Sequence, residues 1–319
     1  MKRRTMLVGI AALVTGVFAA PAMAAFPEKP ITVICPWSPG GGTDVLLRAL
    51  SKEAEKFLGQ SITVVNQTGG AGAIGHNAIR AARPDGYTVG MITFELNSLP
   101  PQGLIPFDYK AFDPLMRVNA DPAALTVKKD APYNTLKEFV DYAKKNPSEI
   151  TIGNSAPGSV WHIAAGLMAD KTGIQVKHVP FDGAAPAVTA LVGGHLKAVA
   201  VSIPEVRGQV QAGNLKILGV MDTERDALFP AVSTFKEQGV DVAFHTWRGL
   251  GLPKGVPADV KAKLADSFKK AMETPDFKEF LKKTSLNPAY LGPDDFSKFL
   301  AQNYKDVEAV MKGLGLAKK

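Results

Sequence analysis

Two glycine-containing segments stand directly before predicted helices and could bind an anion. Residues 40–42 (Gly-Gly-Gly) and Thr43 follow the apolar run 31–34, and residues 153–159 (GNSAPGS) follow a second strand-like run. The first amides of a helix have no intrahelical acceptor and carry a partial positive charge, and glycine lets an anion approach them closely. Two such segments facing each other across a cleft would hold one small carboxylate from both sides. The alternative is that Thr43 or Asp44 only caps the helix while the glycines form a tight turn.

A third glycine cluster formally matches a dinucleotide-binding fingerprint. Gly70, Gly72 and Gly75 have the G-x-G-x-x-G spacing, and Glu95 follows about 20 residues later, where a ribose-binding acid is expected. However, residues 66–68 separate the preceding strand from the glycines, whereas this fingerprint needs its turn directly at the strand end. Export of the chain would also remove it from the cytosolic nicotinamide pool. A dinucleotide-dependent enzyme is therefore the weaker alternative.

The other polar residues form no recognisable catalytic or metal-binding motif. The five histidines show no metal-ligand spacing, and H-E-x-x-H, paired-cysteine, G-x-S-x-G and Walker A patterns are all absent from the sequence. Asp294 and Asp295 stand at a predicted helix start, where capping explains them better than acid–base catalysis. The sequence therefore predicts no metal, no cofactor and no catalytic group.

Aromatic side chains fall at or beside the ends of several predicted strands. They are Trp37, Phe94, Trp161 and Phe181. Ligands of open α/β sheets lie at the carboxyl ends of the strands, so these rings could form one wall of a binding site. Core packing is the alternative explanation for each ring.

The elements that must position these loops alternate along the chain. Strands are predicted at residues 31–34, 61–65 and 87–93, with helices from Leu46 to Leu58 and near 74–82. The same alternation restarts near Asp121-Pro122 and predicts strands at 124–127, 150–152, 176–179, 196–202 and 215–220, and helices at 135–145, from Trp161 and up to Val192. Three further helices are predicted to begin near residues 257, 275 and 293 and to cover the first half. This alternation implies two similar α/β halves with parallel sheets.

The first 24 residues are predicted to be a cleavable secretory signal peptide. Lys2, Arg3 and Arg4 precede an apolar stretch from Met6 to Ala20, and residues 22–24 (Ala-Met-Ala) form a small-x-small cleavage pattern. An uncleaved membrane anchor is the weaker alternative, because a helix needs about 20 apolar residues to span a bilayer. Cys35, the only cysteine, lies beside a strand-like run, which argues against lipid attachment.

The charge and length of the mature chain limit its partners and its architecture. Removing residues 1–24 takes away three basic residues and no acidic one, so the formal net charge falls from +7 to 34 − 30 = +4. This mild positive balance favours small anionic ligands, and no basic stripe interleaved with aromatic residues predicts nucleic-acid binding. A mature chain of about 295 residues predicts two domains.

Five segments of the chain together resemble the Bug-type extracytoplasmic solute receptors of the tripartite tricarboxylate transporter class. They are PWSPGGGTDVLLRAL, GGAGAIGHNAIRAARPDGYT, IPFDYKAFDPL, VPFDGAAPAVTALVGGHL and WRGLGLPKGVPADVKAKL. Each motif is loose, but their order and spacing over nearly the whole mature chain make the resemblance specific. It implies a two-domain periplasmic-binding-protein fold, in which each α/β domain has a mainly parallel sheet flanked by helices and the ligand cleft lies between the domains. The implied domains are residues 25–123 plus 246–319, and residues 124–245.

The resemblance also implies which residues bind the ligand. The loop after the first strand and the Gly/Ser loop of the second domain would hold one carboxylate, partly through ordered water, with Ser38, Gly41, Gly42, Thr43, Asp44, Ser155, Gly158 and Ser159. The far end of the ligand would meet more variable positions, namely Phe94, Asn97, His162, Phe181, Asp182 and Ser202. We expect Asp44 to cap the helix or to order water, so that the backbone amides bind the anion.

Two positions depart from the family pattern. Asn66-Gln67 stands where the family often has Glu-Asn, and Asp182 lies in a loop that frequently carries a lysine. A carboxylate at Asp182 facing the pocket could accept a hydrogen bond from an amino or hydroxyl group of the ligand. The alternative, which we favour, is that Asp182 points to solvent.

These observations predict a monomeric periplasmic protein that captures a small organic carboxylate and presents it to a membrane permease. The aromatic residues favour an aromatic carboxylate, and dicarboxylates, tricarboxylates, amino acids and nicotinate-like acids stay open. Ligand binding would shift an equilibrium between open and closed forms, of which only the closed form docks. A receptor that signals to a sensor kinase and a secreted enzyme are the alternatives. No cofactor, metal or nucleic-acid partner is predicted.

Overall fold

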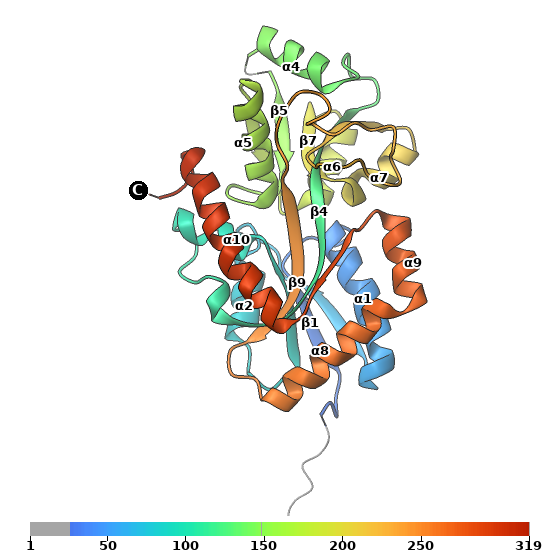
Figure 1. The fold of residues 1–319 in the computed structure, drawn as a ribbon, viewed down its shortest axis with the longest axis vertical. Helices are drawn as coiled ribbons and strands as arrows, with labels where there is room; N and C mark the ends of the chain where they lie inside the picture. The colour runs from blue at the N-terminus through green and yellow to red at the C-terminus, as the bar shows by residue number, and fades with distance from the viewer. Residues whose placement is uncertain (1–25, 148, 319) are drawn as a thin grey trace, which may run out of the picture.

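The computed structural model describes residues 26–147 and 149–318, and the predicted signal peptide lies outside them. Within these residues one ten-stranded sheet has the order β2-β1-β3-β9-β4-β7-β5-β6, and β8 and β10 each pair with β4 beside this path. Figure 1 shows two lobes, one above the other, which the long strands β4 (Phe112–Lys128) and β9 (His245–Pro253) connect. The fold is therefore mixed α/β with two lobes.

Lobe 1 contains both ends of the described chain. Its first strands β1, β2 and β3 pair in parallel, and β9 joins β3 in antiparallel orientation. The elements of lobe 1 beside β9 and the first part of β4 are β1 (Ile31–Cys35), α1 (Gly42–Leu58), β2 (Ile62–Asn66), α2 (Ala73–Ala81), β3 (Thr88–Thr93), α3 (Glu95–Ser98), η1 (Pro100–Gln102), η2 (Tyr109–Ala111), α8 (Ala258–Glu273), α9 (Pro275–Thr284), β10 (Pro288–Leu291) and α10 (Pro293–Gly313).

Lobe 2 is one continuous stretch of chain. Strands β5, β6 and β7 pair in parallel, while β4 pairs antiparallel with both β7 and β8. Its elements beside the second part of β4 are α4 (Leu136–Lys145), β5 (Thr151–Asn154), α5 (Val160–Thr172), β6 (Lys177–Pro180), α6 (Ala184–Val192), β7 (Ala198–Ser202), α7 (Ile203–Gln211) and β8 (Leu215–Val220).

The two crossover strands differ from the sequence-based expectation. The sequence predicts a strand only at 124–127, whereas β4 begins at Phe112, pairs with β9 up to Pro122 and with β7 from Ala123. Strand β9 was not predicted at all. Both strands are buried along much of their length, so they lack the alternation of polar and apolar residues that marks a half-buried strand. Because both are antiparallel to their neighbours, the sheet is mixed rather than parallel throughout.

The helices cover the sheet as their apolar faces require. In α1, Leu46, Leu47 and Leu50 are fully buried, and the helix ends at Gly59, whose φ of 69° is the left-handed conformation that glycine adopts easily. Helices α8 and α9 pack against α1, and α10 runs along β4 (Figure 1). The predicted return of the C-terminal helices to the first half is confirmed. None of the helices in the described residues has the length and hydrophobicity to cross a membrane.

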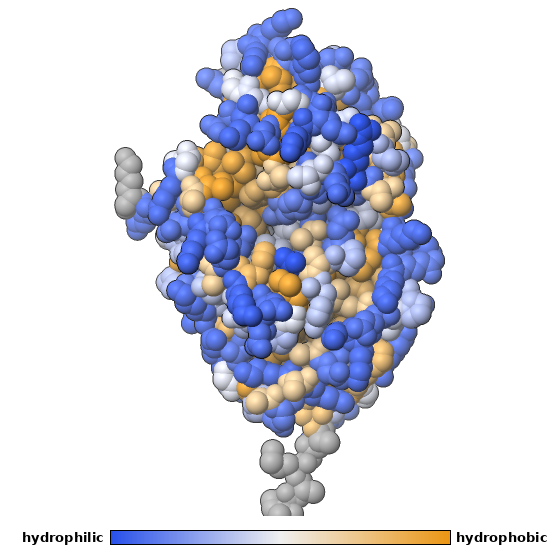
Figure 2. Space-filling view, in the orientation of Figure 1, coloured by the Kyte–Doolittle hydropathy of each residue, from blue (hydrophilic) through white to orange (hydrophobic). Residues whose placement is uncertain are grey.

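The outer surface is mainly hydrophilic on the face shown in Figure 2. Apolar residues reach this surface mostly along the zone where the two lobes meet. Cys35, the single cysteine, is fully buried at the end of β1, and burial raises the pKa of its thiol to about 12. The thiol is therefore a packed core group rather than a reactive one.

Candidate functional site

A small cavity lies between the two lobes, at the ends of β1, β3 and β5. Its volume is about 20 Å³, which is room for on the order of one water molecule. The lining comes from both lobes and comprises Trp37, Ser38, Gly41, Gly42, Thr43, Thr93, Glu95, Ser155, Val160, Trp161, Gly183, Ala184, Glu205, Thr246 and Arg248. The lobes therefore touch each other directly around this space.

The N-terminus of α1 points at the cavity without a side-chain cap. Gly41 is the N-cap residue, and no side chain of the described residues accepts a hydrogen bond from the first turn in that role. The amides of Gly42 and Thr43 have no intrahelical acceptor, because they belong to the first turn. A Cβ atom at Gly42 would lie 3.1 Å from Glu205 Cγ and 3.2 Å from Arg248 Nη2, so glycine lets these side chains approach the helix end.

Asp44 stabilises the loop before α1 and does not line the cavity. Its carboxylate accepts hydrogen bonds from Gly40 N at 2.9 Å, Arg48 Nε at 3.0 Å and Asn66 Nδ2 at 2.8 Å. Burial acts to raise the pKa of Asp44, but these three donors outweigh it and lower the pKa below its ordinary value. The ionised carboxylate thus fixes the turn that carries Gly41.

The N-terminus of α5 is capped twice. Ser159 is the N-cap residue and accepts a hydrogen bond from His162 N at 3.4 Å, and its hydroxyl lies 3.0 Å from that of Ser155. In addition, Val160 N donates to Glu95 Oε1 at 3.0 Å, and Glu95 comes from lobe 1. A carboxylate of the opposite lobe therefore occupies the positive end of this helix.

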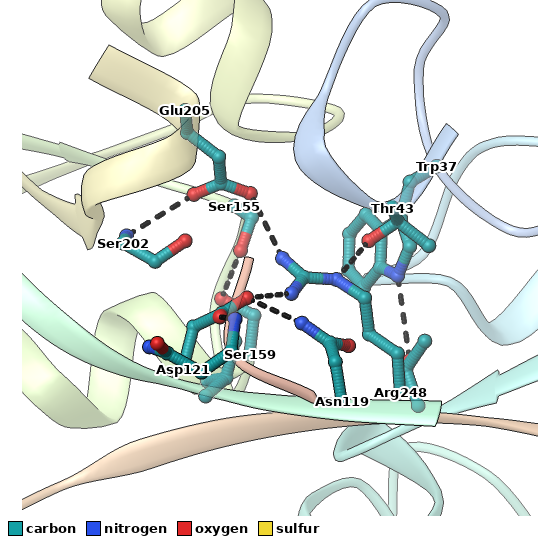
Figure 3. A network of polar contacts seen from close by, with 12 residues as sticks. Trp37, Thr43, Asn119, Asp121, Ser155, Ser159, Ser202, Glu205 and Arg248 are labelled. Carbon is teal, nitrogen blue, oxygen red and sulfur yellow. Dashed lines mark hydrogen bonds and ion pairs between the residues drawn. The ribbon is translucent and has the colours of Figure 1, made fainter. Parts of the chain in front are cut away.

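Arg248 of β9 forms the centre of a buried polar network (Figure 3). Only 2% of this residue is exposed, and its guanidinium donates to Asp121 Oδ2 at 2.6 Å, Thr43 Oγ1 at 2.8 Å and Glu205 Oε1 at 3.3 Å. Asp121 also accepts from Asn119 Nδ2 at 2.6 Å. The network joins the start of α1, both crossover strands and α7 of lobe 2.

Burial governs the acidity of the carboxyl groups in this network. Burial raises the pKa of Glu205 to about 7 although Arg248 acts to lower it, and nearby Asp121 raises it further. The pKa of Glu95 is also raised by burial, against the hydrogen bonds from Thr93 and Val160. Burial therefore favours the neutral form of both carboxyl groups.

Five of the predicted ligand-binding residues line the cavity. They are Ser38, Gly41, Gly42, Thr43 and Ser155. Gly158 and Ser159 lie beside them, and the carbonyl of Gly158 accepts a hydrogen bond from Ser98 Oγ across the lobes at 2.7 Å. On the outer side, Ser38 Oγ donates to the carbonyl of Asp182 at 2.7 Å.

The structure does not bring the six predicted far-end residues into the lining of this cavity. Phe94 packs edge-on against Phe244, and Asn97 donates to Leu300 O at 3.1 Å and to Asn303 Oδ1 at 2.9 Å, which fastens α3 to α10. The remaining four are placed as follows: His162 packs against the His178 ring, Phe181 is half-buried, Asp182 is exposed on the outer surface, and Ser202 is the N-cap residue of α7.

Several cavity residues were not among those predicted from the sequence. Glu205 and Arg248 stand out, and each had a weak signal: Arg248 is a lone charge inside the apolar run WRGLGLP, and Glu205 is three residues after the helix-capping Ser202. Trp37 and Trp161, considered as an aromatic wall, both line the cavity. Glu95, considered as a ribose-binding acid, lies in the same lining.

The glycines that matched a dinucleotide fingerprint have a packing role instead. A Cβ atom at Gly75 would lie 2.6 Å from Pro36 Cα, so this glycine lets α2 pack against the loop after β1. Glu95 lines the cavity between the lobes and bonds to Val160 of lobe 2, and none of these three glycines lines that cavity. Among the described residues, no cluster of three or more His, Cys, Asp or Glu side chains could hold a metal ion.

Comparison with known families identifies the chain. The family model for the tripartite tricarboxylate transporter family receptor matches residues 46–316. The chain belongs to this receptor family. A protein encoded in the gbd 5′ region of Cupriavidus necator is 34% identical, and the match covers 100% of this chain and 99% of that one. BugT of Bordetella pertussis is 28% identical over 99% of this chain and 98% of its own length.

Two solved structures show the same two-domain periplasmic-binding-protein fold as this receptor. Rpa4515 of R. palustris, solved with adipate, superposes with a TM-score of 0.88 at 25% identity and covers 92% of this chain and 99% of its own. MatC of Rhodopseudomonas palustris, solved with bound malate, gives a TM-score of 0.83 at 26% identity and covers 89% of this chain and 99% of its own. The predicted fold class and the predicted Bug-type family are confirmed.

Proposed function

We propose that this receptor captures a small organic carboxylate between its lobes and presents it to the permease subunits of a tripartite tricarboxylate transporter. The observation that carries the proposal is the uncapped N-terminus of α1, where Gly41 and Gly42 leave backbone amides open beside the guanidinium of Arg248. Such a helix end binds carboxylates through its amides and its dipole. The relatives solved with adipate and malate hold acids of this kind.

The direct contacts between the lobes suggest how a ligand would enter. Glu95 bonds to Val160, Ser98 to Gly158 and Ser38 to Asp182, and a ligand in the cavity would separate or bridge these pairs. The lobes would open by bending β4 and β9 where these strands pass from lobe 1 to lobe 2. The domains that move would be residues 25–123 plus 246–319, and residues 124–245. Ligand binding would shift the population toward the closed form.

The proposal includes the setting in which the receptor works. Residues 1–24 would be removed during export, and the mature chain would act in the periplasm as a monomer. The site would bind its acid without transforming it, because Glu95 and Glu205 are held by backbone amides or by Arg248 rather than beside a nucleophile.

A thermal-shift experiment tests carboxylate binding. The mature protein, unfolded and refolded to remove carried-over ligand, is melted with mono-, di-, tri- and aromatic carboxylates, since a ligand that binds only the native state raises the melting temperature. We expect at least one acid to stabilise the wild type and to lose its effect in Gly42→Val, whose side chain would fill the approach to α1. Gly313→Val is the control, because a Cβ atom there meets nothing within 4 Å. No shift with any acid, or an equal loss in the control, would refute the proposal.

A further inference from the structure

Glu95 is the one cavity-lining carboxylate without a basic partner. Its oxygens accept hydrogen bonds from Val160 N and Thr93 Oγ1, and across residues 26–147 and 149–318 no Lys, Arg or His side chain forms an ion pair with it. Glu95 is 1% exposed. Burial favours the neutral form of this carboxyl group, and an ammonium group bound beside it would favour the ionised form, which has about four lone-pair positions. Two acceptor positions of Glu95 therefore stay available to a ligand.

Arg248 is the one cation among the residues that line the cavity, and its N–H groups already have acceptors in the protein. Its guanidinium donates to Asp121 at 2.6 Å, to Thr43 at 2.8 Å and to Glu205 at 3.3 Å, so it is held at the α1 side of the cavity. Besides Glu95, Glu205 and Arg248, no residue of the cavity lining carries a formal charge. A dicarboxylate with its first carboxylate at the α1 end would bring its second carboxylate toward Glu95, where the lining offers no further cation, and an unpaired buried charge is strongly unfavourable.

We propose that Glu95 is a specificity-determining residue, which makes the receptor select an acid with one carboxylate and one ammonium group over a dicarboxylate of equal length. This inference rests on the proposed function. The ligand carboxylate binds at the α1 amides, and its ammonium group donates to the free acceptor positions of Glu95. Glu95 already offsets the partial positive charge at the start of α5, so this helix end is not free to bind a second ligand carboxylate.

Matched ligand pairs test this selectivity by calorimetric titration of the refolded, ligand-free mature protein. The pairs are adipate with 5-aminopentanoate, glutarate with 4-aminobutanoate, and terephthalate with 4-(aminomethyl)benzoate. We expect the amino acid of the preferred pair to bind at least about tenfold more tightly than its diacid, because the ammonium group pairs with Glu95 whereas a second ligand carboxylate would be buried without a cation. Glu95→Gln keeps the acceptor for Val160 N and should remove this preference.

A matched control separates charge at the cavity from charge elsewhere. Glu53→Gln removes another buried glutamate, 5% exposed and paired with Lys56 on α1, and should leave the ligand preference unchanged. Melting curves of each variant verify that it is folded. Diacids that bind as tightly as their amino counterparts, or an unchanged preference in Glu95→Gln, would overturn this inference and leave carboxylate binding intact. If no acid of the panel binds, both the inference and the proposed function fail.

Discussion

The N-termini of α1 and α5 face the same cavity, but only that of α5 is capped by side chains. Helix α1 begins behind Gly41 with no side-chain cap, whereas α5 begins behind Ser159 and also receives Glu95 from the other lobe. Both ends carry the same partial positive charge. The difference shows that a helix dipole alone does not define an anion site: at α1 the amides are open to a ligand, and at α5 the protein supplies its own carboxylate.

The electrostatic balance on the two sides follows from this difference. Near α1 the guanidinium of Arg248 adds positive charge, and Glu205 approaches it from lobe 2. Near α5, Glu95 is the one ionisable residue in the cavity lining. The two ends of one small cavity therefore favour opposite ligand charges, which is what a zwitterion satisfies.

The largest change should come from removing the cation on the α1 side. Arg248→Met leaves Asp121 and Glu205 buried without their shared partner, and breaking a buried ion pair in this way costs about 3–5 kcal/mol. We expect the free energy of unfolding, measured by urea denaturation, to fall by this amount. The double variant Arg248→Met with Asp121→Asn should recover part of the loss. Equal stability of wild type and Arg248→Met would show that the network contributes little.

The pH dependence of stability should be the next largest effect. Burial raises the pKa of Glu205 from 4.5 to about 7, so the folded protein binds a proton at this site that the unfolded chain has already released. The stabilisation from this proton is fully present below the unfolded pKa and is lost as the pH rises through about 7.

Denaturation curves collected across this pH range for wild type and Glu205→Gln measure the contribution. In Glu205→Gln, the free energy of unfolding should lack the part of its decline with pH that comes from Glu205. Glu95→Gln should likewise lack the part that comes from Glu95, because burial raises the pKa of this residue in the same direction. An identical pH profile in wild type and Glu205→Gln would mean that Glu205 keeps its charge throughout.

The smallest effect on stability should come from exchanging the two caps. Gly41→Ser gives α1 the cap residue of α5, and the N-cap backbone, with φ −74° and ψ 163°, already suits serine. Serine in place of glycine at this position changes helix stability by only a few tenths of a kcal/mol. Ser159→Gly should lower it by a similar amount.

Ligand binding should respond more strongly to the cap exchange than stability does. The hydroxyl of Gly41→Ser would occupy an amide that a ligand carboxylate needs, so the affinity for the best acid of the panel should fall. Isothermal titration of both variants gives the comparison. Unchanged affinity in Gly41→Ser together with a large loss in Ser159→Gly would place the carboxylate at α5 instead and reverse our assignment of the two ends.

Local sequence signals were sufficient for most of the secondary structure. The apolar spacing of Leu46, Leu47 and Leu50 predicts the buried face of α1, and Gly59 predicts its end. The loops before α1 and α5 were also found from their glycines. These features depend on residues within one or two turns of each other, so they are visible in a single sequence.

The crossover strands and the central network could not be found in the same way. In strand β9, Arg248 lies within the otherwise apolar and glycine-rich run WRGLGLP, and such a charge has no local explanation. Its partner Thr43 is 205 residues away in the chain, and Glu95 is 65 residues from Val160. No spacing rule connects residues so far apart.

The sequence by itself therefore determined the alternating elements and the two glycine loops, because hydrophobic period and turn residues are local properties. It also determined the resemblance to a carboxylate receptor, because the order of the motifs is read directly along the chain. Only the tertiary structure decided what each loop faces. Packing the lobes together brings Glu95 to α5 and Glu205 to α1, and the pairing of β9 with β3 inside lobe 1 places Arg248 beside α1. The charge at each end of the cavity is set by residues that meet only after the chain has folded, since burial and pairing, rather than residue type, fix how a carboxyl group behaves.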